Sequence, residues 1–340
     1  MRYRRTRSKA GRCARPNNHL QSAIKERPAS QPGVLHIYGH VYGTVDCVAM
    51  QLSPWIMAGR PRTLTLSMTP VIVGAALAWA VERELHWGAI VAALVASMFI
   101  QLGTNLHNDA ADSERGGDGP DRVGPPRVTA SGLLEATAVK RGAMVCFALA
   151  GLLGLYLVAV GGWPILLLGI FSILSGWAYT GGPMPIAYTP LGELFVVIFF
   201  GLGAVCGVYW LCTDALNAAA IEAGLALGLL AGAVLLVNNH RDAEADARVG
   251  RRTLAIVAGP SVTALIYAGL MLFPFALLLP IGDRLPRGFV WPALIALPVA
   301  LGMIYYFVRE PRGRGFNKIL VRTVFTQFLF GILLSLGLVL

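Results

Sequence analysis

The chain has 340 residues, of which 56% are hydrophobic and only 14% charged, and its mean hydropathy is +0.63. Soluble domains carry about 25% charged residues, so this composition excludes a soluble globular enzyme and indicates a membrane protein. The net charge is +10, and residues 2–27 supply most of it, with nine basic residues against one acidic residue. The rest of the chain is therefore nearly neutral.

Residues 1–50 form a basic segment ahead of the apolar chain. This composition predicts a disordered extension that is attracted to anionic lipid. A start of the protein at Met50 is the alternative interpretation. No apolar core of about 7–15 residues follows the basic run directly, so a secretory signal peptide is not indicated. Nucleic acid is not an expected partner. Residues 51–340 are expected to form one transmembrane domain.

Apolar runs of about 17–25 residues are long enough to cross a bilayer as helices. Nine such runs follow one another, at residues 63–81, 87–106, 142–160, 163–180, 191–212, 216–237, 261–281, 288–308 and 319–340. The sequence therefore predicts an all-α integral membrane protein with about nine transmembrane helices.

Lysine and arginine indicate the orientation, because they concentrate in the cytoplasmic loops of membrane proteins. With the N-terminus inside, the charged inner segments are 1–62, 107–141, 239–252 and 309–322. These segments hold 25 of the 28 basic residues, and only Arg83, Arg284 and Arg287 fall outside. We therefore expect a multi-pass protein of the cytoplasmic (inner) membrane with a cytoplasmic N-terminus.

Two acidic clusters stand at the ends of the second and sixth apolar runs. They read Asn-Leu-His-Asn-Asp-Ala-Ala-Asp over 105–112 and Asn-Asn-His-Arg-Asp-Ala-Glu-Ala-Asp over 238–246. A shift of 133 positions aligns Asn105 with Asn238, His107 with His240 and Asp109 with Asp242. Either cluster alone could be a solvated helix end, but carboxylates near lipid are usually functional. The matched pair predicts two halves of one cytoplasmic site.

The spacing within each cluster suits a metal site, because residues three or four apart share a helix face. The side chains spaced in this way are Asn105, Asn108, Asp109 and Asp112 in the first cluster, and Asn238, Asp242 and Asp246, beside Asn239, in the second. We expect each run to direct its oxygen atoms to one side. Mg²⁺ prefers oxygen ligands and binds a few carboxylates together with substrate phosphates. The clusters therefore predict a site for a polyanion and a metal ion.

Arginines and glycines follow both clusters and precede the first apolar run. Glycines let the backbone approach a phosphate, and arginines clamp its oxygens in a bidentate manner. The arginines within glycine-containing stretches are Arg122, Arg127 and Arg252. The concentration of positive charge in inner loops explains Arg62, Arg248 and Arg251 equally well.

These motifs resemble those of the UbiA superfamily of intramembrane aromatic prenyltransferases, and most of all the 1,4-dihydroxy-2-naphthoate polyprenyltransferases of the menaquinone pathway. The segments that carry the likeness are 60–64, 108–118, 121–127, 179–188 and 238–254. The sequence departs from the pattern at Gly116, at His240 and at Arg251-Arg252, which replaces a Gly-Lys pair. The likeness covers about residues 54–340 and leaves the basic extension unexplained.

The resemblance implies transfer of a polyprenyl group from polyprenyl diphosphate to an aromatic acceptor, most simply 1,4-dihydroxy-2-naphthoate with decarboxylation. It implies two Mg²⁺ ions, held by Asn108, Asp112, Asp118, Asp242 and Asp246. Asp109 and Asn239 would orient these ligands. The implied diphosphate-binding residues are Arg60, Arg122, Arg127, Lys140 and Arg252. Tyr179 would offer its ring to the allyl cation, although a tyrosine of the membrane interface is an equal interpretation.

Two alternatives stay open. Within the superfamily the acceptor could be 4-hydroxybenzoate or homogentisate, because only resemblance favours the naphthoate. From another class, an ion-coupled transporter also uses carboxylates within the membrane. Transporter sites lie near the bilayer midplane, whereas both acidic clusters here stand at helix ends beside arginine-rich loops.

Overall fold

The computed structural model describes residues 53–83, 85–116, 122–285 and 289–340. Asp118 and the basic extension, 1–50, lie outside these residues. The long helices are α2 (Leu64–Glu82), α3 (Trp87–Glu114), α4 (Ala136–Ala178), α7 (Ala218–Arg248), α8 (Leu254–Ala276), α10 (Leu297–Arg309) and α11 (Phe316–Val339). The shorter elements are η1 (Pro61–Thr63), η2 (Ile186–Tyr188), α5 (Gly192–Val196), the π-helical η3 (Val197–Gly203), α6 (Ala204–Thr213), α9 (Leu278–Arg284) and η4 (Trp291–Ala296). The predicted all-α class is confirmed for the part of the chain that is described.

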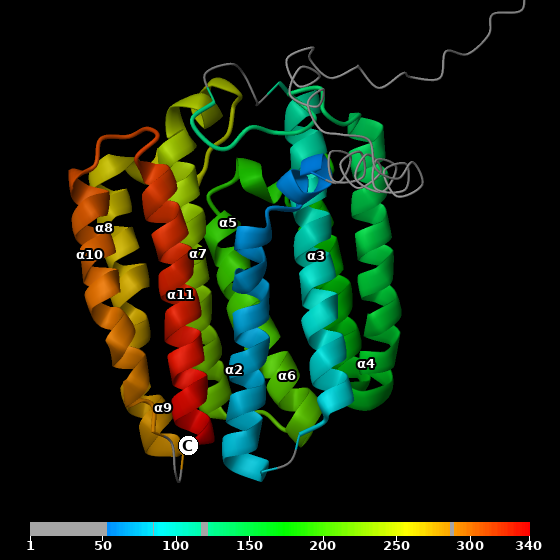
Figure 1. Cartoon of the computed structure of the whole chain (residues 1–340), viewed down its shortest axis with the longest axis vertical. Helices are drawn as coiled ribbons and strands as arrows, with labels where there is room; N and C mark the ends of the chain where they lie inside the picture. The colour runs from blue at the N-terminus through cyan, green and yellow to red at the C-terminus, as the bar shows by residue number, and fades with distance from the viewer. Residues whose placement is uncertain (1–52, 84, 117–121, 286–288) are drawn as a thin grey trace, which may run out of the picture. The chain divides into compact units, whose positions relative to one another are not determined.

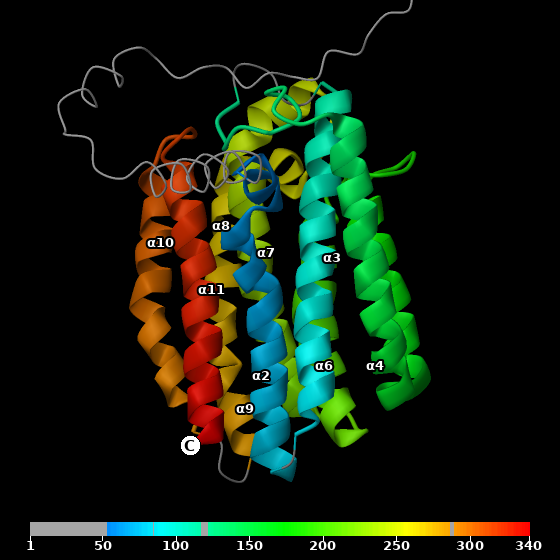
Figure 2. The same ribbon diagram turned by 45° about the vertical axis from the view of Figure 1, so that its right-hand side comes forward.

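The long helices lie side by side in a bundle and run roughly along its long axis (Figures 1 and 2). The end of α3, the start of α4, the end of α7 and the start of α8 meet at one end of the bundle, which we call the polar end (Figure 1). The C-terminus lies at the opposite end. The two acidic clusters, on α3 and α7, are thus brought to the same end of the molecule.

Eight helices in the described residues are long and apolar enough to cross a membrane, and one of them, α4, has 43 residues. A straight helix of that length would be about 65 Å long, twice the thickness of the hydrocarbon core. Gly162 breaks α4 with a left-handed φ of 69°. Both ends of α4 return to α3, where Lys140 pairs with Glu114 and Arg115 donates a hydrogen bond to the carbonyl of Thr180. Counted as two arms, α4 brings the crossings to the predicted nine.

The helices α3 and α7 continue beyond the apolar runs from which they were predicted. The runs ended at 106 and 237, whereas the helices end at Glu114 and Arg248. Both acidic clusters therefore lie on helix, so the expected spacing of three and four residues does describe neighbouring side chains. The charged turns could not be assigned to a span from hydropathy, because their composition is that of a loop.

Helix α7 forms the centre of the bundle. In its most apolar window 72% of the residues are buried, against 28% in α4 at the rim. Glycines let α7 approach η3 closely: a Cβ atom on Gly201 would stand 2.3 Å from the carbonyl oxygen of Gly224 and 2.4 Å from the Cα of Gly228. Within a membrane no water is present to drive helices together by the hydrophobic effect, so they associate through van der Waals packing. Small residues let the backbones approach closely enough for this packing.

We predict that Gly201→Ala lowers the thermal stability of the detergent-solubilised protein. The added methyl group must push η3 away from α7, and such overpacking costs about 1–3 kcal/mol. The matched control is Gly269→Ala in α8, where no atom lies within 4 Å of the added carbon. Thermal melts of the two variants should show a lower midpoint for Gly201→Ala alone, and equal midpoints would contradict the close packing of η3 on α7.

Candidate active site

A chamber of about 350 Å³ lies at the polar end of the bundle. Its acidic and amide side chains come from α3 and α7 and are Asn108, Asp112, Asn238, Asn239, Asp242 and Asp246. Its arginines are Arg60, Arg122, Arg127, Arg248 and Arg251. Residues from both clusters, 133 positions apart in the sequence, thus line one space together with a set of guanidinium groups.

Asp112 lies at the centre of this charge arrangement. Its side chain is 3% exposed and is held by two arginines: Arg127 pairs with one carboxylate oxygen at 2.6 Å, and Arg251 pairs with the other. Arg251 also reaches Asp246 at 3.1 Å. Burial alone would lower the pKa of Arg251, but the neighbouring Asp112 and Asp246 raise it above its ordinary value. The guanidinium therefore stays charged between its two carboxylates.

Asp242 is held differently, by the arginine next to it in sequence. Arg241 donates to both carboxylate oxygens of Asp242, at 2.8 and 2.6 Å, in a bidentate pair. The same guanidinium donates to the side-chain oxygens of Asn238, at 2.9 Å, and of Asn317 in α11, at 2.8 Å. Arg241 thereby fixes the end of α7 against α11. Arg241 lies within the second acidic cluster, but the spacing of that cluster predicted no role for it.

Asp109 and Asn105 do not face the chamber beside Asp112, contrary to the expected common direction of the first cluster. The carboxylate of Asp109 accepts hydrogen bonds from the backbone N–H groups of Val128 and Thr129, at 3.3 and 3.0 Å, and from the Thr129 hydroxyl, at 2.6 Å. Asn105 stands seven residues before Asp112, so it lies about 10 Å deeper in the bundle. Asp109 thus anchors the loop that carries Arg127.

The predicted basic residues divide into two groups. Arg60, Arg122 and Arg127 line the chamber. The exposed side chain of Arg252 does not line it, and Lys140 pairs at 2.5 Å with Glu114 on the surface.

Arg251 takes the place in the chamber that was expected for Arg252. The left-handed φ of Gly250, 78°, turns the chain after α7 so that the first of the two arginines points inward. Hydropathy and motif spacing do not reveal which of two adjacent arginines faces a site, because that depends on this turn.

Glu193 was missed in the sequence. Its side chain, on α5, is 5% exposed and accepts a hydrogen bond of 2.9 Å from the amide nitrogen of Asn239. This bond directs the amide of Asn239, which lines the chamber. A signal was present, because Glu193 is the only charged residue in the apolar run 191–212, and intramembrane carboxylates are usually functional.

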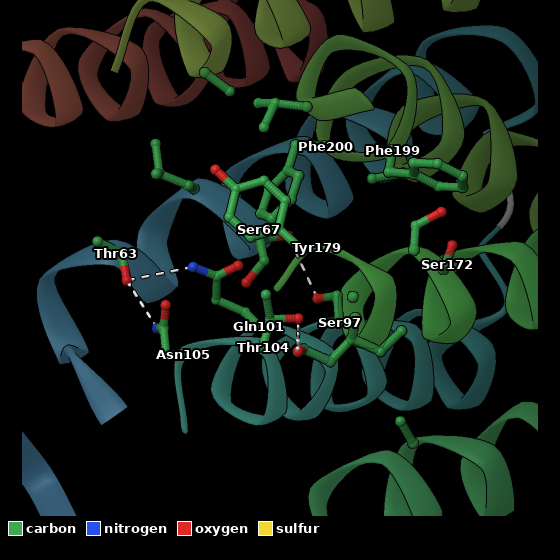
Figure 3. Close-up of a pocket in the computed structure, with 18 of the residues that line it drawn as sticks. Thr63, Ser67, Ser97, Gln101, Thr104, Asn105, Ser172, Tyr179, Phe199 and Phe200 are labelled. Atoms are coloured by element: carbon green, nitrogen blue, oxygen red, sulfur yellow. Dashed lines mark hydrogen bonds between the residues drawn. The ribbon is translucent and has the colours of Figure 1, made fainter. Parts of the chain in front are cut away.

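A second, larger cavity of about 1090 Å³ extends from the chamber into the bundle. Most of its lining is aliphatic or aromatic, from α2, α3, α4, η3 and α11. Tyr179 lines both spaces, and its ring faces the cavity in Figure 3. Burial, together with the carboxylate of Glu193, raises the pKa of the Tyr179 hydroxyl. Tyr179 is therefore a neutral aromatic ring at the junction between a charged chamber and an apolar cavity.

The sequence model of the UbiA prenyltransferase family matches residues 67–330. The chain belongs to this family. It is 35% identical over 293 residues to the 1,4-dihydroxy-2-naphthoate octaprenyltransferase of Escherichia coli (strain K12), covering 83% of this chain and 94% of that protein. The enzyme of the same name from Bacillus subtilis (strain 168) is 35% identical over 283 residues, covering 82% and 90%.

Solved structures of UbiA homologs share the fold. The homolog from Archaeoglobus fulgidus bound to DMAPP and Mg²⁺ matches with a TM-score of 0.61 at 14% identity, over 84% of this chain and 98% of that one. The apo structure of a homolog from Aeropyrum pernix K1 matches with a TM-score of 0.60 at 12% identity, over 81% and 96%. The UbiA-type helical bundle predicted from the motifs is confirmed.

We predict that Asp109→Leu loosens the loop before α4 without disturbing the helix that carries it. Each hydrogen bond to a charged group contributes about 1.5–3 kcal/mol, and the substitution removes those that hold Val128 and Thr129. Hydrogen exchange measured by mass spectrometry should speed up by about tenfold or more in peptides covering 122–134. The control is Glu114→Leu on the same helix, which removes an exposed ion pair. Unchanged exchange in Asp109→Leu would show that Asp109 does not anchor the loop.

Proposed function

We propose that this protein transfers a polyprenyl group from polyprenyl diphosphate to 1,4-dihydroxy-2-naphthoate, with loss of CO₂, to give demethylmenaquinol, the reduced form of demethylmenaquinone. The observation that carries the proposal is the junction of a chamber rich in arginine and carboxylate with a large apolar cavity. A polyprenyl diphosphate has the same two parts. The names of relatives that match over most of the chain support the naphthoate as acceptor.

The arginines of the chamber would bind the diphosphate. Guanidinium groups bind phosphate oxygens in bidentate fashion, and they stabilise negative charge that develops on a leaving group. Arg127 and Arg251 already stand together on Asp112 at the chamber wall. They would neutralise the diphosphate as the allylic C–O bond breaks and the bonding electrons leave with the phosphate oxygen.

The chamber also offers ligands that suit Mg²⁺. The candidates are Asn108, Asp112, Asp242 and Asp246, to which Asp118, outside the described residues, is added from the sequence. In the described residues no three His, Cys, Asp or Glu side chains converge closely enough to hold an ion alone. This fits an ion that takes part of its coordination from substrate phosphates, as Mg²⁺ does. When bound, Mg²⁺ would act as a Lewis acid on the leaving phosphate.

The apolar cavity would hold the prenyl chain and keep water from the reacting carbon. Water would capture an allyl cation, so its exclusion is part of the chemistry. The neutral ring of Tyr179 stands where the chamber meets the cavity and would offer its face to the cation. The ring carbon that bears the carboxylate forms the new C–C bond, and the electrons released with CO₂ restore the aromatic ring.

We also propose that the polar end faces the cytoplasm from the inner membrane. The inner segments of the sequence hold 25 of 28 basic residues, and several of these residues gather in the chamber. Positive charge of this kind marks the cytoplasmic side.

The decisive assay supplies labelled polyprenyl diphosphate and Mg²⁺ to the purified protein in lipid, with 1,4-dihydroxy-2-naphthoate, 4-hydroxybenzoate or homogentisate as acceptor. We expect a prenylated product with the naphthoate that is lost on chelation of Mg²⁺ and in Asp112→Asn and Asp242→Asn. Glu114→Gln, which alters only an exposed pair, should retain activity. Product with the benzoate or homogentisate alone would overturn the acceptor, and no product with any of the three would overturn the proposal.

The adjacent arginines after α7 give a matched test of the chamber. We predict that Arg251→Ala lowers kcat/KM by about 100-fold, a size typical for loss of one group that stabilises developing charge. Arg252→Ala should stay within about threefold of the wild type, because that side chain is exposed and its backbone N–H, not its guanidinium, bonds to Tyr188. Steady-state rates at saturating Mg²⁺ measure both, and equal losses would contradict the placement of Arg251.

A further inference from the structure

A row of polar side chains enters the apolar cavity from α3. Ser97, Gln101, Thr104 and Asn105 all line the cavity, opposite aromatic side chains such as Phe200 (Figure 3). Ser97 and Thr104 donate to backbone carbonyls of their own helix, at 2.8 Å in both cases, and so need no other partner. Gln101 and Asn105 differ, because their amides are held from outside the helix.

Thr63 holds both amides. The amide nitrogens of Gln101 and Asn105 lie 3.3 and 3.1 Å from the hydroxyl oxygen of Thr63. That hydroxyl donates its own hydrogen to the carbonyl of Arg60 at 2.9 Å, so it can only accept from the two amides. Asn105 makes a second bond, 2.9 Å, to the carbonyl of Gly59. Each amide must therefore point its NH₂ group, and not its carbonyl oxygen, toward the segment 59–63.

The consequence is a fixed direction for the two amide oxygens. With both NH₂ groups committed to η1, the oxygens of Gln101 and Asn105 face the cavity (Figure 3), and neither oxygen has a hydrogen-bond partner among the described residues. Both residues are only 6–7% exposed. Because both residues line the cavity, their two acceptor oxygens are open to a ligand that donates hydrogen bonds.

We propose that the oxygens of Gln101 and Asn105 bind the two hydroxyl groups of the aromatic acceptor, which makes them its specificity-determining residues. This inference rests on the proposed function and names the acceptor subsite within it. The two residues are one helical turn apart, about 6 Å along the axis. The subsite lies directly below Asn108, between the charged chamber and the prenyl cavity.

The two amide oxygens can only accept hydrogen bonds, so they distinguish the reduced form of the aromatic ring from its oxidised form. A dihydroxy ring donates a hydrogen bond to each amide oxygen, whereas the corresponding quinone or dimethyl ether donates none. A site built to bond a hydroxyl group rejects the analogue that lacks it far more strongly than an apolar pocket rejects a size change. The subsite therefore takes the reduced, hydroxylated acceptor and excludes its oxidised form before any bond is made.

The test compares Gln101→Leu with the wild type in the prenyl-transfer assay, and uses Gln327→Leu as the matched control. Gln327 is fully buried on α11, does not line the cavity, and has no hydrogen-bond partner in the described residues. We expect Gln101→Leu to raise the KM for 1,4-dihydroxy-2-naphthoate about tenfold, the equivalent of one hydrogen bond, while the KM for polyprenyl diphosphate stays unchanged. Gln327→Leu should alter neither constant.

A second measurement uses the 1,4-dimethoxy analogue of the acceptor as a competitive inhibitor. The wild type should bind it at least tenfold more weakly than the dihydroxy compound, and Gln101→Leu should bind the two more equally. Thr63→Val keeps both amides but removes their anchor, so it should also reduce the discrimination. A KM that rises equally for both substrates in Gln101→Leu, or unchanged discrimination in that variant, would overturn the subsite. A wild type inactive with every aromatic acid would instead overturn the proposed function.

Discussion

The ion pairs of Asp112 hold the polar end of the bundle together. One buried carboxylate joins the end of α3 to the loop before α4 through Arg127, and to the turn after α7 through Arg251. Removing one partner of a buried pair leaves an uncompensated charge, which typically costs about 3–5 kcal/mol. Arg251 is 139 residues from Asp112 in the sequence, so this one carboxylate brings distant parts of the chain together and sets the shape of the chamber. The polar residues that line the chamber are positioned by the same contacts.

A membrane enzyme that handles a polyanion and an apolar chain must keep two solvents apart, and the fold does so along α3 and α7. Both helices carry apolar residues through the bundle and acidic turns at its polar end. Tyr179 and Asn108 line both spaces and therefore mark the boundary. Charges on one side of this boundary act in a medium that contains little water, which strengthens each electrostatic contact with a phosphate. The apolar side provides room for a prenyl chain, whose exposure to water is unfavourable.

Much of this arrangement could be predicted from the sequence, because hydropathy and helical periodicity are local properties. The nine crossings of the described residues and the convergence of the two clusters are of this kind. Arg122 and Arg127 were expected from their glycine-containing stretches, and Arg60 only from the resemblance to the family. What could not be predicted depends on tertiary contacts. The choice of Arg251 over Arg252 follows from the turn at Gly250.

The likeness between the two clusters shows where sequence alignment stops being a guide to role. The shift of 133 positions lays Asp109 on Asp242, yet Asp109 binds the backbone of a loop and Asp242 lines the chamber in a bidentate pair with Arg241. A helix presents each residue at 100° from the next, so two helices that enter a site at different rotations and depths present different members of the same motif. From α3, Asn108 and Asp112 line the chamber. Asn105, two turns deeper than Asp112, lines the cavity below it. Equal motifs therefore perform unequal tasks, and the asymmetry suits two substrates that share one site but not one chemistry.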